Sequence, residues 1–70
     1  MNPEDLTTRF TYHPPKEGQP EKYQCIRSEA HDLAKTIVTV TPPCREQSLA
    51  LTKLEEAVFW ANASIARNGE

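Results

Sequence analysis

The 70-residue sequence contains no run of about 20 apolar residues, so a helix that spans a membrane is not expected. Lys and Arg together number eight against ten Asp and Glu, and the net charge is −2 at pH 7. A protein that binds polynucleotides needs many cations to displace counterions from the phosphate backbone, so this partner class is not expected either. A small anionic ligand is compatible with this charge, because one or two placed cations can hold it.

Two further absences concern targeting and phosphate loops. The first ten residues include Glu4 and Asp5 and lack the apolar stretch of a secretory signal peptide, so we expect the protein in the cytoplasm of the cell that expresses it. Only two glycines are present, Gly18 and Gly69, and they cannot form a Gly-rich loop that cradles phosphate groups.

Cysteine is also scarce, with only Cys25 and Cys44 in the chain. Along a helix, Cys25 would lie roughly 20 Å from a turn near Cys44, whereas a disulfide needs Cα atoms about 6 Å apart. We therefore expect two free thiols, buried or half-buried. A metal site is not expected, because Cys25 and His31 lie about 240° apart around a helix and neither C-x-x-C nor H-x-x-x-H occurs.

No set of catalytic residues is apparent. Ser48 and Ser64 have no histidine at a useful helical spacing, and Ser28 with His31 has no third residue to complete a triad. Glu55 and Glu56 are adjacent, so on a helix their side chains diverge by about 100°. We predict no enzymatic activity, no catalytic residue and no cofactor.

Proline positions predict one all-α domain, residues 1–70. Residues 1–19 read as an arm, in which one short helical turn near residues 3–9 is compatible with the sequence. Helix one is predicted over residues 20–40 and helix two over 43–67, with Pro42-Pro43 ending the first. So short a turn makes the two helices antiparallel neighbours.

Apolar residues spaced alternately by three and four positions support both helices. In helix one the predicted stripe is Tyr23, Ile26, Ala30, Leu33 and Ile37. In helix two it is Leu51, Leu54, Val58, Ala61 and Ile65. The run from Thr36 to Thr41 is β-branched, so helix one is expected to weaken there.

The hairpin cannot bury all its apolar surface alone. Val58, Phe59, Trp60 and Ala61 are consecutive and therefore surround helix two, while helix one covers a single side of it. The arm, another subunit or a ligand must cover the rest. We predict a homo-oligomer in which the arm and a neighbouring subunit provide this cover.

The arm carries aromatic rings at Phe10 and Tyr12, followed by His13 and Pro14-Pro15. An extended, proline-stiffened segment can present one ring to a nucleobase, and such stacking is worth about 1–3 kcal/mol. Composition alone favours the alternative that both rings plug the helical core. Tyr12 is the better ligand contact, since its hydroxyl needs a polar partner.

Two segments give the chain a family resemblance. The run from Leu49 to Asn68, LALTKLEEAVFWANASIARN, and the arm segment RFTYHPP from Arg9 resemble the small phage proteins known as anti-CBASS cyclic-nucleotide sponges, whose hairpin is similar to that of the Thoeris anti-defence sponges. The resemblance implies a helical protomer assembled as a hexamer. It implies binding, without cleavage, of cyclic dinucleotides such as 3′,3′-cGAMP, and often of cyclic trinucleotides, in the cytoplasm of the host bacterium.

The resemblance also implies site residues. Tyr12 would be the aromatic contact of a cyclic dinucleotide pocket between two protomers, and Arg27 the cation that meets phosphate. Phe10, His13, Pro14 and Glu29 are expected to line this pocket. A second pocket, for cyclic trinucleotides, would form where C-terminal helix ends meet, with Asn62 and Arg67 as its candidates.

Two other functions are weighed against a sponge. One is a structural or protein-docking hairpin that uses Trp60 and the arm and has no nucleotide ligand. The other is a helix-turn-helix DNA-binding protein, which the long helices, the turn without glycine and the negative net charge disfavour.

Overall fold

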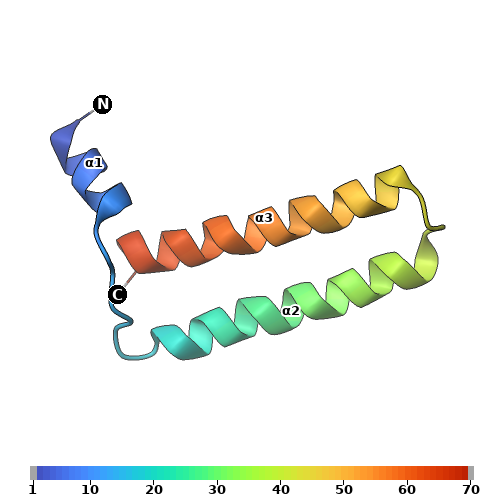
Figure 1. The fold of residues 1–70 in the computed structure, drawn as a ribbon. Coiled ribbons are helices and arrows are strands. Elements are labelled where there is room, and N and C mark those ends of the chain that lie inside the picture. The colour runs from blue at the N-terminus through green and yellow to red at the C-terminus, as the bar shows by residue number, and fades with distance from the viewer. Residues whose placement is uncertain (1, 70) are drawn as a thin grey trace.

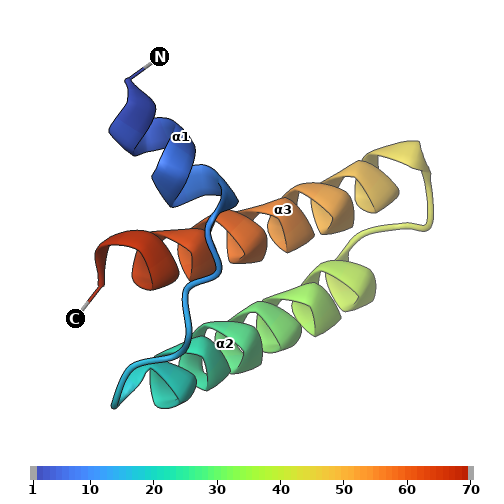
Figure 2. The ribbon, with the colours of Figure 1, turned by 60° about the vertical axis from the view of Figure 1, so that its left-hand side comes forward.

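The computed structural model of this protein describes residues 2–69 and contains three helices. They are α1 (Pro3–Phe10), α2 (Gln19–Val40) and α3 (Arg45–Asn68). α2 and α3 run antiparallel side by side, and α1 lies near the C-terminal end of α3, on the α3 side of the hairpin (Figures 1 and 2). The prediction of an all-α hairpin with an N-terminal arm and a short first helix is therefore confirmed; its oligomerisation stays a prediction.

Local capping sets where the first two helices begin. The side-chain oxygen of Asn2 accepts a hydrogen bond from the backbone N–H of Glu4 at 2.8 Å, and Pro3 occupies the first turn of α1. Gly18 precedes α2 with φ at +83°, a left-handed conformation that suits glycine. Because Gly18 reverses the chain there, α2 begins at Gln19, one residue before the predicted Pro20.

Two expectations are wrong, namely the start of the second long helix and the burial of the two cysteines. Cys44 caps α3, its Sγ accepting from the backbone N–H of Gln47 at 3.4 Å, so the helix begins at Arg45 and Pro43 stays in the turn. Cys25 and Cys44 are both free and exposed, rather than buried or half-buried. Cys25 lies on the outer side of α2, and Cys44 lies in the turn, where α2 does not cover it.

The β-branched end of α2 is regular helix to Val40, despite the expected weakening. Three threonine hydroxyls there donate to the carbonyl oxygen four residues earlier: Thr36 to Asp32, Thr39 to Lys35 and Thr41 to Ile37. These bonds suit threonine in a helix, because its hydroxyl can reach that carbonyl.

Half-buried residues form a seam where α2 and α3 pack. On α3 they follow the predicted stripe of Leu51, Leu54, Val58, Ala61 and Ile65. On α2 one predicted position is wrong, since Ala34 lies in the seam while Leu33 is 50% exposed. The other predicted positions, Tyr23, Ile26, Ala30 and Ile37, are half-buried.

The hairpin is a single layer of helices. No hydrophobic side chain of residues 2–69 is fully buried, and Phe59 and Trp60 are 61% and 68% exposed. Within the same residues no helix is long and apolar enough to cross a membrane. An apolar surface of this kind is typical of a protein that associates with further chains.

We expect Trp60→Asp to disrupt association. At a position exposed in the assembled protein the change would alter stability by less than about 0.5 kcal/mol, whereas at a buried interface the loss of a tryptophan is worth about 2 kcal/mol or more. Sedimentation should show a smaller particle, and thermal unfolding a lower midpoint that depends on concentration.

Lys53→Ala is the control for this experiment, because Lys53 lies on the same helix, 72% exposed, in a surface pair with Glu56 at 3.6 Å. It should leave the particle mass unchanged. An unchanged mass for Trp60→Asp would contradict the prediction.

Candidate functional site

The arm is fixed to the hairpin by Gln19, the one fully buried residue among those described, with 1% of its surface exposed. Its side-chain Nε2 donates to the carbonyl oxygen of Ile65 in α3 at 3.1 Å. Its Oε1 accepts from the backbone N–H of Lys16 in the arm at 2.9 Å. One amide thus joins the arm, the start of α2 and the last turns of α3.

Two further contacts strengthen this junction. The backbone N–H of Gly69 donates to the same Ile65 carbonyl at 2.8 Å, and the ammonium group of Lys16 lies 3.4 Å from the carbonyl of Gly69. We call these four residues, Lys16, Gln19, Ile65 and Gly69, the arm clamp. Because the clamp holds Lys16, it also sets the position of the preceding prolines.

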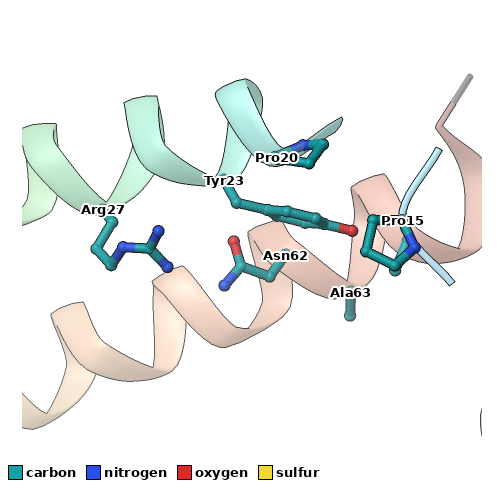
Figure 3. A pocket seen from close by; sticks show the side chains of 7 residues that line it. Pro15, Pro20, Tyr23, Arg27, Asn62 and Ala63 are labelled. Carbon is teal, nitrogen blue, oxygen red and sulfur yellow. The ribbon is translucent and has the colours of Figure 1, made fainter. Parts of the chain in front are cut away.

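Beside the arm clamp lies a pocket of about 480 Å³. Three segments build it: the arm, the first turns of α2 and the C-terminal half of α3 (Figure 3). Its lining residues are Pro15, Pro20, Tyr23, Arg27, Asn62, Ala63 and Ala66. We call it the arm pocket.

The arm pocket combines an aromatic ring, a cation and an amide. The ring of Tyr23 lies along the space between the helices, with its hydroxyl directed toward Pro15 (Figure 3). The carbonyl oxygen of Asn62 is directed toward α2, between Arg27 and Tyr23 (Figure 3). Proline and alanine supply the other walls, so the polar groups of these three side chains converge on an otherwise apolar pocket.

Arg27 is held along α2 by its own helix. Its Nη2 donates to Oε1 of Gln24 at 2.9 Å, and Nε2 of Gln24 donates in turn to the hydroxyl of Ser28 at 2.9 Å. Among residues 2–69 no carboxylate forms an ion pair with Arg27, so its charge is available to an anion.

The aromatic arm residues lie outside the arm pocket. Phe10 and Tyr12 are 84% and 79% exposed, so within one protomer neither ring plugs the core. His13 is half-buried, and its Nε2 lies 2.7 Å from the carbonyl oxygen of Thr8. Pro14 is exposed next to Pro15, which does line the pocket.

The remaining candidates are distributed over other surfaces. Glu29 lines a separate depression along the seam, with Asp32 and Leu33. Arg67 lines a depression with Phe59 and Trp60 on the outer side of α3. The resemblance places Asn62 and Arg67 in one second pocket, but in the protomer Asn62 lies with Arg27 instead. Within residues 2–69 no three His, Cys, Asp or Glu side chains are grouped to hold a metal ion.

Sequence reasoning missed Tyr23 and Pro15 as pocket residues. The spacing predicts Tyr23 in the apolar stripe, and the residue is half-buried there. The spacing does not reveal that the ring of Tyr23 also borders a pocket. A signal was present in the polar Asn62 next to the seam position Ala61, since an amide at the edge of an apolar stripe needs a partner.

Comparison with known proteins identifies a family. A family model described as "Acb2/Tad1, hairpin domain" matches residues 2–66, nearly the whole chain. No curated protein matches the chain, and no solved structure does.

We expect Gln19→Leu to release the arm. The change leaves the Lys16 N–H without its buried acceptor, a loss of about 1–3 kcal/mol. Amide hydrogen exchange in residues 11–18 should be faster than in the unmodified protein, while exchange in the middle of α2 and α3 should stay the same. Gln24→Leu is the matched control, because it replaces an exposed glutamine on the same helix and should leave the arm protected. Equal protection of the arm in both variants would argue against the clamp.

Proposed function

Because the chain belongs to the Acb2/Tad1 hairpin family of anti-CBASS and anti-Thoeris sponges, we propose that it binds and sequesters cyclic oligonucleotide second messengers without cleaving them. The family match over residues 2–66 carries this proposal. The ligands would be cyclic dinucleotides such as 3′,3′-cGAMP and, in addition, cyclic trinucleotides. Captured messenger cannot activate the CBASS effector, and a phage that makes the protein in the host bacterial cytoplasm escapes the defence.

The charges and rings near the arm support an anionic, base-containing ligand. Arg27 has a guanidinium that can grip two phosphate oxygens, and among the described residues no carboxylate neutralises it. Tyr12 has a ring that is 79% exposed on the arm, available to stack on a base. Tyr23, in the same pocket as Arg27, provides a second aromatic surface.

The ligand and the assembly would share symmetry. A cyclic dinucleotide carries two phosphates and two bases, and a two-fold interface would supply one Arg27 and one Tyr12 from each protomer. The exposed Phe59 and Trp60 provide apolar surface for such association. We propose a hexamer, as the family implies.

Other residues complete the proposed sites. Phe10, His13, Pro14 and Glu29 would line the dinucleotide pocket from one protomer or its neighbour. Arg67, beside Phe59 and Trp60, is the cation that we assign to a trinucleotide pocket. Asn62 lines the arm pocket in the protomer, so it would approach Arg67 only in the assembly.

A second function is worth testing because Phe59 and Trp60 are so exposed. In that alternative the hairpin docks another protein through these rings and has no nucleotide ligand. The two functions differ in what happens to a cyclic nucleotide mixed with the protein.

Isothermal titration with 3′,3′-cGAMP tests the proposal. We expect tight binding and, after heat denaturation of the protein, recovery of unaltered ligand by chromatography. Altered ligand would instead indicate an enzyme. If neither 3′,3′-cGAMP nor a panel that includes cyclic tri-adenylate binds, the docking hairpin becomes the better interpretation.

Tyr12→Ala should reduce affinity for 3′,3′-cGAMP by about fivefold to a hundredfold for each stacked base, because it removes a ring worth about 1–3 kcal/mol. The particle mass should not change, because we assign Tyr12 to the ligand and assign Phe59 and Trp60 to the assembly. Titration measures the affinity and sedimentation the mass. A dissociated variant would show that Tyr12 serves assembly instead.

Arg27→Gln should lower the affinity and also flatten its dependence on salt. A charge-assisted contact to phosphate weakens as ionic strength rises, whereas an amide contact does so much less. Titrations at low and high salt measure both effects. Arg45→Gln, at the far end of the hairpin in the first turn of α3, is the control and should keep the salt dependence of the unmodified protein.

A further inference from the structure

One polar atom of the arm pocket has no partner. The side-chain oxygen Oδ1 of Asn62 is buried and accepts no hydrogen bond from any residue in the described range. Buried carbonyl oxygens are nearly always paired, so this oxygen requires a donor that residues 2–69 do not supply in this structure. The oxygen is directed toward α2, so a donor on α2 is well placed to reach it (Figure 3).

Arg27 is such a donor and is engaged elsewhere in this state. It lines the same pocket, and its side chain extends toward the Asn62 oxygen in Figure 3. Its one hydrogen bond within residues 2–69 goes to Gln24, which keeps the guanidinium along α2. A guanidinium has five N–H donors in a rigid fork, so it can bind one acceptor of the protein and still offer an edge to a phosphate.

From this arrangement we infer that Asn62 is a positioning residue for Arg27. When a phosphate occupies the arm pocket, the guanidinium leaves Gln24, donates one N–H to Oδ1 of Asn62 and turns its other N–H groups to the phosphate oxygens. The inference rests on the proposed function in one respect, namely that Arg27 meets a phosphate of the ligand.

The chemistry of an amide suits this role better than that of a carboxylate. An amide oxygen accepts from the guanidinium and fixes its plane, yet it leaves the positive charge intact for the ligand. A carboxylate would fix the same plane but neutralise the charge and repel phosphate. Pro20, Ala63 and Ala66 add apolar walls beside these polar contacts.

Two leucine substitutions separate this role from a structural one, because they should act in opposite directions. Asn62→Leu removes the acceptor that holds Arg27 in the pocket, so affinity for 3′,3′-cGAMP should fall about tenfold. Gln24→Leu removes the acceptor that holds Arg27 outside it, so affinity should rise about twofold to threefold. If both residues were merely structural, both variants would bind more weakly.

Thermal unfolding without ligand provides a second readout. Leucine in place of Asn62 removes an unpaired buried acceptor and keeps the volume, so the midpoint of the free protein should stay the same or rise. The midpoint increase caused by ligand should become smaller. In an Arg27→Lys background the effects of both leucine substitutions on affinity should shrink to less than about twofold, because lysine lacks the planar fork.

The outcomes keep the two proposals distinguishable. If the unmodified protein binds no cyclic nucleotide, the proposed function fails and this role for Asn62 falls with it. If the unmodified protein binds, but Asn62→Leu binds equally well or Gln24→Leu binds more weakly, the function stands and the positioning role is overturned. The same holds if the effects of the leucine substitutions persist undiminished in the Arg27→Lys background.

Discussion

The side chain of Gln19 is the interaction on which the rest of this protomer depends. Two helices joined by a short turn are held at one end by the covalent chain, but at the other end nothing covalent keeps the arm near α3. Gln19 provides that connection, since it donates to Ile65 and accepts from Lys16 while almost fully shielded from water. Hydrogen bonds shielded in this way contribute more than exposed ones, because water cannot replace either partner. The arm pocket exists because this junction holds Pro15 opposite Tyr23 and Asn62.

The pocket and the exposed rings follow from the same limitation of size. A hairpin of two helices has no interior, and no hydrophobic side chain of residues 2–69 is fully buried. Space that a larger protein would fill with side chains is here left as open depressions along the seam. A protein so built is suited to binding, since its apolar surface can be covered by a neighbouring chain and its open pocket by a ligand.

Periodicity and proline positions are enough to predict the two long helices, because each rests on local interactions, whereas they are only compatible with the short first helix. The boundaries move by one or two residues where a cap decides them, as at Gly18 and Cys44. The spacing predicts Leu33 in the seam although Ala34 lies there, since spacing alone cannot fix which flank of a stripe faces the partner helix. Arg27 comes from the family resemblance, and its place in a pocket with Asn62 could not be foreseen, because that contact depends on the register of α3 against α2.

The thinness of the seam has a consequence for how such a protein can change over evolution. Ala30, Leu54 and Val58 line depressions on both sides of the hairpin, so each of these side chains belongs to two surfaces at once. A larger residue at one of them would reshape both surfaces together. In a thicker protein one face can change in sequence while the other is conserved. Here a mutation in the seam changes both faces. Adaptation to a new ligand should therefore begin in the arm, where Pro15 borders the arm pocket and none of the depressions along the seam.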